Sequence, residues 1–162
     1  MSCPTRKITI GLAGLPNLVL DKVPSGDRLC DRVPADYPQA GDRNARGGVA
    51  DKGNLNFGAT YEWEPTALLT SAERALLGRY LATYKVISST IFVLQDENEH
   101  LDIVEASGRP RSLVPSSTIT LSGATLGYYA FNTYLKIESP NFIAFQGGDL
   151  YLLKGLKFIE VV

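Results

Sequence analysis

The fold of this chain is decided by residues 54–94, which read NLNFGATYEWEPTALLTSAERALLGRYLATYKVISSTIFVL. The first part alternates between apolar and polar side chains, a pattern typical of a half-buried β-strand. Its apolar members are Leu55, Phe57, Ala59, Tyr61 and Trp63. Pro65 ends this strand, because proline cannot donate a hydrogen bond to a neighbouring strand.

The same stretch contains the helix that the sequence predicts. Thr70 and Glu73 form a Thr-x-x-Glu capping box, which predicts a helix start. We expect a helix over about residues 70–85, with one apolar stripe made of Leu76, Leu77, Tyr80, Leu81 and Tyr84. Gly78 lies within this helix and costs about 1 kcal/mol relative to alanine. A close helix-sheet or helix-helix approach at Gly78 would offset that cost.

A run rich in β-formers, Val86–Leu94, follows the predicted helix. Near its end the apolar residues occupy both faces, namely Ile91, Phe92, Val93 and Leu94. This pattern predicts a central strand that is covered on both sides. A polar turn at residues 96–99 then leads to a second strand at residues 101–104, so we expect a hairpin here.

Alternating patterns and turn residues predict further strands along the rest of the chain. They comprise an N-terminal hairpin of residues 8–12 and 18–20, strands at 113–121 and 129–137, a hairpin of 142–145 and 151–153, and a C-terminal strand at 158–162. Strands at this spacing with one helix indicate a mainly β fold. We expect a single domain over residues 1–162, an antiparallel β-sandwich or barrel with one packed helix.

Composition excludes several classes of function. Charged residues make up 20% of the 162 residues and the formal net charge is −1, without a cluster of lysine and arginine. This balance provides no attraction to nucleic acid or to an anionic membrane. No apolar run approaches the roughly 20 residues needed to span a bilayer, and the first ten residues do not resemble a signal peptide. We expect neither a nucleic-acid nor a membrane partner.

The sequence contains no motif for catalysis, for a cofactor or for a metal. The cysteines are Cys3 and Cys30, and the histidine is His100; their spacing does not suit zinc. Two free thiols are the simplest interpretation, with a disulfide between the two cysteines as the alternative. The acidic turn at residues 96–99 lacks the pattern of a calcium loop, and Gly147-Gly148 lacks the lysine of a phosphate-binding loop.

The character of the chain changes over residues 21–53, which we interpret as an extended polar arm. Aspartate is followed by arginine or lysine five times in this stretch, and its acids and bases balance. A solvated polyampholyte without a partner is one interpretation. The other is an arm that orders against a neighbouring subunit, because arginine pairs with carboxylates in a directional way. The candidate interface residues are Asp27, Arg28, Asp31, Arg32, Tyr37, Asp42, Arg43 and Arg46.

The layout resembles the tail-tube fold of tailed bacteriophages. One helix between strands of a β-sandwich, with a long loop after the first hairpin, is similar to tube, distal-tail and baseplate-hub proteins. The segments that carry the resemblance are Gly58–Trp63, Leu68–Leu77, Ile91–Leu94 with the turn at 96–99, and Gly127–Tyr129 leading into Phe131–Ile137.

This resemblance implies a non-enzymatic virion component that self-assembles into a ring, hexameric or trimeric, within a phage tail or baseplate. Its partners would be itself and other tail or baseplate proteins, without a cofactor. It would be found in the virion tail, and in the host cytoplasm during assembly. The arm at 21–53 and the sheet edges would contact neighbouring subunits.

Two alternatives come from other classes. A carbohydrate-binding β-sandwich for host-surface recognition would use exposed aromatic rings such as Tyr128 and Tyr134 as stacking platforms. An enzyme would use paired acids such as Glu62 and Glu64, but alternating carboxylates on a strand are usually a solvated face. The sequence favours the structural role over both.

Overall fold

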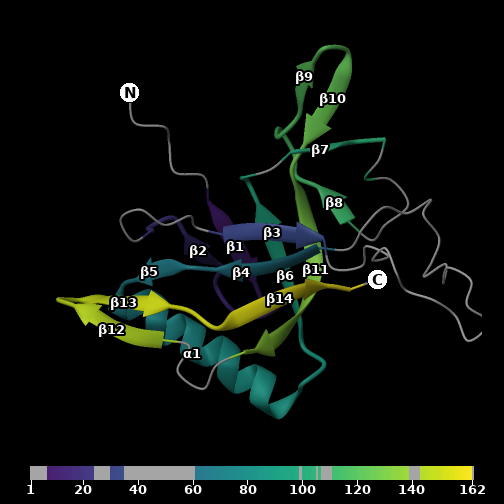
Figure 1. Ribbon diagram of the computed structural model, residues 1–162. Coiled ribbons are helices and arrows are strands. Elements are labelled where there is room, and N and C mark those ends of the chain that lie inside the picture. The colour runs from purple at the N-terminus through teal and green to yellow at the C-terminus, as the bar shows by residue number, and fades with distance from the viewer. Residues whose placement is uncertain are drawn as a thin grey trace, which may run out of the picture.

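In the computed structural model of this chain, the structure describes residues 7–23, 30–34, 61–98, 100–104, 106, 111–138 and 143–161. These residues form β1 (Ile8–Gly11), β2 (Leu18–Leu20), β3 (Cys30–Pro34), β4 (Tyr61–Pro65), β5 (Ala67–Leu69), α1 (Ser71–Val86), β6 (Ile91–Asp96), β7 (Leu101–Asp102), β8 (Arg111–Leu113), β9 (Ile119–Leu121), β10 (Ala124–Gly127), β11 (Tyr129–Ile137), β12 (Ile143–Gly147), β13 (Leu150–Leu153) and β14 (Leu156–Glu160). The predicted mainly β fold with one helix is confirmed (Figure 1).

The strands form one large antiparallel sheet and two small ones. The large sheet has the order β2-β1-β6-β11-β14-β4-β3, and β8 also pairs with β11. β8 and β14 share one edge of β11, β8 along residues 129–131 and β14 along residues 133–137. The small sheets have the orders β7-β10-β9 and β12-β13-β5.

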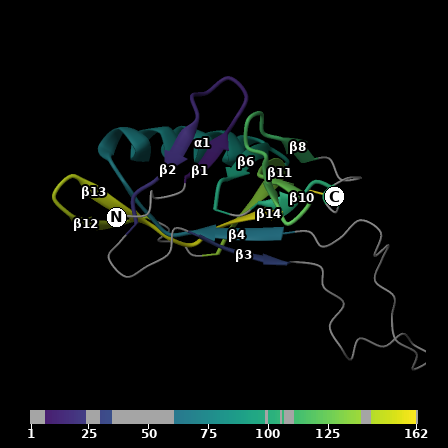
Figure 2. The same cartoon turned by 90° about the horizontal axis from the view of Figure 1, so that it is seen from above.

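The large sheet curls into a half-barrel around the core (Figures 1 and 2). Two strands, β11 and β14, separate β6 from β4, which would place β6 and β4 roughly 14 Å apart in a flat sheet. The indole Nε1 of Trp63 on β4 nevertheless donates to Oδ2 of Asp96 on β6 at 3.0 Å. This bond crosses the concave side, so the sheet must bend to bring the two strands together.

The helix begins where the capping box predicts. The backbone N–H of Glu73 donates to the Thr70 hydroxyl at 3.3 Å, and the Thr70 N–H donates to the Glu73 carboxylate at 3.4 Å. Leu77, Tyr80 and Leu81 are buried, and Leu76 and Tyr84 pack partly buried against them, so the predicted stripe is confirmed. Gly78 is exposed, and a Cβ there would meet no atom of the described residues within 4 Å. No element among the described residues therefore approaches Gly78 closely enough to offset its cost.

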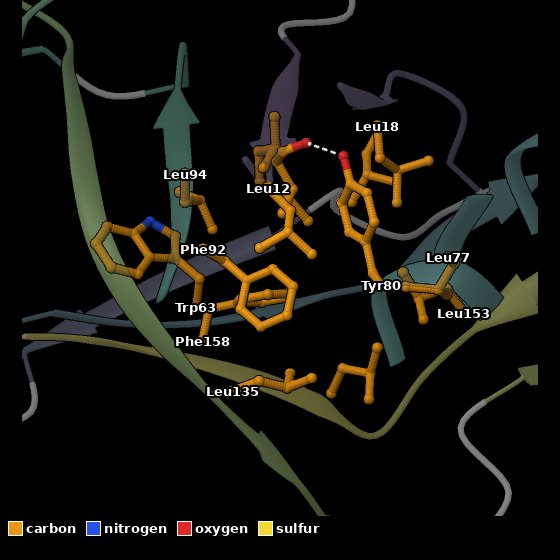
Figure 3. Packing of buried hydrophobic residues seen from close by; sticks show 14 of the residues in the cluster. Leu12, Leu18, Trp63, Leu77, Tyr80, Phe92, Leu94, Leu135, Leu153 and Phe158 are labelled. Atoms are coloured by element: carbon orange, nitrogen blue, oxygen red, sulfur yellow. Dashed lines mark hydrogen bonds between the residues drawn. The ribbon is translucent and has the colours of Figure 1, made fainter. Parts of the chain in front are cut away.

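The core fills the concave side between the sheet and α1. Figure 3 shows Tyr80 and Leu77 of α1 beside Phe92 and Phe158 from the sheet, with Trp63 closing the other end. The Phe92 and Phe158 rings pack edge to face with centroids 5.9 Å apart, and the Trp63 ring packs against Phe131 at 4.7 Å. α1 also contacts β2, β5 and β13.

Several predicted elements agree with the structure. The N-terminal hairpin is formed by β1 and β2, with Ile8 opposite Leu20. β4 buries Trp63 and exposes Glu64, as its alternation predicts; residues 54–60 of the same predicted strand lie outside the described residues. β11 buries alternate residues from Tyr129 to Leu135. β12 and β13 form the predicted hairpin, and β14 is the predicted C-terminal strand.

Other predicted elements differ from the structure. The helix extends to Val86 and β6 begins only at Ile91. The expected hairpin of β6 with residues 101–104 is wrong, because β7 pairs with β10 instead. The predicted strand over 113–121 is divided into β8 and β9 by a turn in which Ser116 has φ of 63°. β5 was not expected.

The polar arm at 21–53 contains a strand that its composition did not indicate. β3 lies within it and pairs with β4 at the edge of the large sheet. The start of the arm is held to the helix, because Lys22 forms ion pairs with Asp21 at 3.2 Å and with Glu73 at 2.8 Å. Residues 24–29 and 35–53 of the arm lie outside the described residues.

Candidate interaction surface

The outer, convex face of the large sheet carries apolar side chains that no described element covers. Alternate residues of β6 point inward and are buried, whereas Ile91 and Val93 remain 42% and 39% exposed. Tyr134, on the neighbouring β11, is 42% exposed. The expectation that β6 is covered on both faces is therefore wrong, because α1 lies on the concave side only.

Strand register assembles these residues into one surface. Tyr134 lies opposite Ile91 on β6 and opposite Ile159 on β14, which makes a row across three strands. Val93 lies in the next row, between Gly11 and Asn132. We call Ile91, Val93, Tyr134 and Ile159 the outer-face patch.

Charged side chains border the outer-face patch and neutralise one another. Lys157 lies 3.5 Å from Glu62 and 3.4 Å from Glu138, and Lys136 lies 3.2 Å from Glu138. The hydrogen bond from Lys136 lowers the pKa of Glu138, helped by the nearby Lys157. Burial opposes the charged form of Lys157, but Glu62 and Glu138 outweigh it and raise the pKa of this lysine. The border thus contains two cations and two anions within contact distance.

A buried ion pair joins β8 and β14 where they meet on the edge of β11. Nε of Arg111 donates to Oε1 of Glu160 at 2.5 Å, and a terminal guanidinium nitrogen donates to Oε2 at 2.9 Å. Both side chains are almost fully buried, at 3% and 1% exposure. The backbone N–H of Tyr61 also donates to Glu160, and the guanidinium lies 5.1 Å from the centre of the Tyr61 ring. We call this contact the β8–β14 seam.

The buried carboxylates of these elements are engaged by neighbouring groups. Glu160 is paired with Arg111, and Asp96 accepts hydrogen bonds from Trp63 and from the backbone of Asn98. Within the described residues, no three His, Cys, Asp or Glu side chains gather in a way that could hold a metal ion. The same part of the chain contains no helix that is long and apolar enough to cross a membrane.

The structure places only two of the candidate arm residues. Asp31 and Arg32 lie on β3, opposite Glu64 and Trp63 of β4. Asp27, Arg28, Tyr37, Asp42, Arg43 and Arg46 lie outside the described residues. β3 ends the order of the large sheet, so Asp31 and Arg32 stand at a sheet edge.

The two tyrosines suggested for carbohydrate stacking lie apart. Tyr134 belongs to the outer-face patch, whereas Tyr128 precedes β11, with its ring packed edge-on against His100 at 5.5 Å. Burial raises the pKa of Tyr128, and Glu97 adds to this effect. Along an extended chain, Tyr128 and Tyr134 are separated by roughly 20 Å, so the two rings do not form one platform.

The paired acids Glu62 and Glu64 both belong to β4. Glu62 is engaged by Lys157, and Glu64 is exposed.

Comparisons with known proteins identify no relative: no protein-family model, no curated protein and no solved structure matched this chain. The outer-face patch is a candidate interaction surface that the sequence analysis does not predict. Its signal is present in the apolar residues on both faces of residues 91–94, although the same pattern predicts burial under a second layer.

Proposed function

We propose that this protein is a non-enzymatic structural subunit that self-assembles, in a ring of the kind found in the tails and baseplates of tailed bacteriophages. The observation that carries the proposal is the outer-face patch, with Ile91, Val93 and Tyr134 each about two-fifths exposed on a sheet face that no described element covers. Apolar side chains that remain in contact with water in the free subunit gain free energy when another surface covers them.

A second copy is the occupant that the border charges favour. Lys136 and Lys157 pair with Glu62 and Glu138 beside Tyr134 and Ile159, so this border has no net charge and does not repel a different surface of a second copy, whose formal net charge is −1. A partner with a strong net charge of either sign would gain nothing from such a border. A neutral border of this kind is compatible with self-association.

The magnitudes indicate that the face does not act alone. Completing the burial of a side chain that is two-fifths exposed contributes about 1 kcal/mol. The burial of three such residues contributes less than the roughly 4–15 kcal/mol that association costs in lost translational and rotational freedom. The arm at 21–53 would contribute the remaining free energy of association, since its strand β3, which includes Asp31 and Arg32, lies at an edge of the large sheet.

The test replaces the centre of the patch with charge. The double substitution Ile91→Lys and Val93→Lys is expected to reduce assembly at least about 10-fold, because two lysines must lose water in the contact. Light scattering gives the mass and negative-stain microscopy shows the rings. The control is Ala75→Lys with Ala82→Lys, which adds the same charge on the exposed side of α1.

Two results would contradict the proposal. One is a wild-type protein that stays monomeric at every concentration and ionic strength tested. The other is an Ile91→Lys, Val93→Lys variant that assembles as the wild type does while its circular dichroism shows an unchanged fold.

A further inference from the structure

The edge strand β9 lacks the features that normally prevent strand pairing between molecules. Edges are usually blocked by charged side chains, bulges or covering segments. β3 carries Asp31 and Arg32, and β7 carries Asp102. The register of β12 shifts between Phe145 and Gly147, and the N–H of Leu68 on β5 is bonded to the Lys22 carbonyl that follows β2. β9 has none of these protections.

The unprotected strand belongs to an uncharged part of the sequence. Charged residues make up 20% of the chain, yet none occurs from Ser112 to Leu135. All three residues of β9 are exposed, and Ile119 and Leu121 are 44% and 56% exposed. β9 is the last strand in the order β7-β10-β9, and Figure 1 shows its hairpin projecting at the end of the molecule opposite to α1.

Hairpin geometry shows which polar groups of β9 point outward. Leu121 lies opposite Ala124 across the two-residue turn of Ser122 and Gly123, whose φ angles are 51° and 82°. In such a hairpin the pair that flanks the turn exchanges hydrogen bonds, and the next residue directs its N–H and C=O to the other side. Thr120 is that next residue. Its backbone groups therefore point away from β10, along the open edge.

We propose that β9 pairs antiparallel with β9 of a second copy, about a two-fold axis that passes by Thr120. The two Thr120 residues then exchange both of their outward hydrogen bonds, as an antiparallel ladder requires. Ile119 comes opposite Leu121 of the second copy, and the reverse pair follows by symmetry. Two apolar pairs form on one face and a threonine pair on the other, and no like charges meet.

This interface is separate from the outer-face patch, so it can be tested without it. Sedimentation velocity of the Ile91→Lys, Val93→Lys variant measures the association that remains once the outer face is charged. The β9 pairing predicts a dimer whose dissociation constant is unchanged by those two substitutions. Larger assemblies are expected to disappear in the same variant only if the proposed ring contact is also correct, so the two ideas fail independently.

The decisive substitution places a charge at the two-fold axis. In that background, Thr120→Lys is expected to raise the dimer dissociation constant at least about 10-fold, because two lysines become direct neighbours across the pair. Thr125→Lys is the matched control: Thr125 lies opposite Thr120 but one strand inward. Its two copies would stand roughly 14 Å apart, beyond the screening length, and a change within about 2-fold is expected.

A charge exchange distinguishes the two-fold pairing from any other use of this edge. Thr120→Asp alone is expected to impair the dimer as Thr120→Lys does, and an equimolar mixture of the two variants to restore it. A Thr120→Lys variant that dimerises like its parent, a mixture that fails to restore the dimer, or a parent that remains monomeric at millimolar concentration would each overturn the proposal. Binding of another protein at β9 in place of the dimer would also overturn it.

Discussion

Tyr80 connects the helix to the first hairpin through its hydroxyl group. The residue is 1% exposed, and its hydroxyl donates to the Ile10 carbonyl at 3.0 Å and contacts the Pro16 carbonyl (Figure 3). Burial raises the pKa of this phenol above its ordinary value of 10.0. The fold thus favours the neutral hydroxyl, because a phenolate has no proton to donate to these carbonyls. Its charge would also lose hydration in the core.

Replacing Tyr80 with phenylalanine should destabilise the protein in a way that depends on pH. At neutral pH the loss is expected to be about 2 kcal/mol, because buried carbonyl acceptors lose their donor. A raised pKa contributes stability that is complete below pH of about 10 and is lost as pH rises further. The difference between wild type and Tyr80→Phe should therefore narrow above pH of about 10.

Urea unfolding at a series of pH values measures this difference. Burial also raises the pKa of Tyr128 and of Tyr129, so both proteins should lose stability in alkali, and the difference between the two curves reports Tyr80 alone. A difference that stays constant from neutral pH into strong alkali would show that the Tyr80 phenol has the same pKa in the folded and unfolded chain.

At the scale of elements, the β8–β14 seam holds two strands in line on one edge of β11. Glu160→Gln keeps the shape and an acceptor for the Tyr61 N–H, but it removes the carboxylate charge that faces the buried Arg111 guanidinium. Removing one partner of a buried pair is expected to cost about 3 kcal/mol. Thermal and chemical unfolding measure it.

The control for the seam is the same substitution in an exposed ion pair. Glu138→Gln removes the contact with Lys136, whose side chain is 59% exposed, and should leave the melting temperature unchanged. Adding Arg111→Met to Glu160→Gln should recover part of the lost stability, because no cation is then buried beside the neutral glutamine. If Glu160→Gln is as harmless as Glu138→Gln, the seam does not hold β8 and β14 in line.

Local signals in the sequence predicted elements well and their partners poorly. The capping box at Thr70 and the alternation of β11 depend on neighbouring residues, so they can be read from the chain. β14 lies between β11 and β4, which is a pairing of distant segments without a local pattern. The outer-face patch was missed for the same reason: residues 91–94 show two apolar faces, but covering one of them requires an element elsewhere in the chain.

β3 shows a second limit of sequence reasoning. Its residues, Cys-Asp-Arg-Val-Pro, lack the alternation of a half-buried strand and belong to a stretch of repeated acid-base pairs. The backbone of β4 supplies the pairing that makes them a strand. The candidate surfaces therefore differ in how far the sequence predicts them: the contact of the arm with a neighbouring subunit stays a prediction, whereas the uncovered sheet face and the open edge of β9 are not predicted.

At the scale of the whole molecule, the two proposed contacts differ in symmetry. A ring requires a head-to-tail contact between unlike surfaces, whereas the β9 pair joins like surfaces about a two-fold axis. If both operate, two rings stack face to face and the number of subunits is even. The outer-face patch would then join subunits within each ring, and β9 would join the two rings.

Thr120→Lys in the otherwise wild-type chain is therefore expected to halve the mass of the particle while the rings persist. Native mass spectrometry measures the subunit number, and Thr125→Lys provides the control, with the mass unchanged. An odd subunit number in the wild type, or a Thr120→Lys particle of undiminished mass, would show that no two-fold contact joins the rings.

The position of β14 inside the large sheet has a consequence for folding during synthesis on the ribosome. Chains emerge from their N-terminal end during synthesis, so β4 and β3 leave the ribosome long before the strand that joins them to β11. Until β14 is translated, β4 and β3 lack the strand that pairs them with the rest of the large sheet. Trp63 is synthesised before Phe131 and Phe158, yet it is expected to be among the last side chains to lose contact with water.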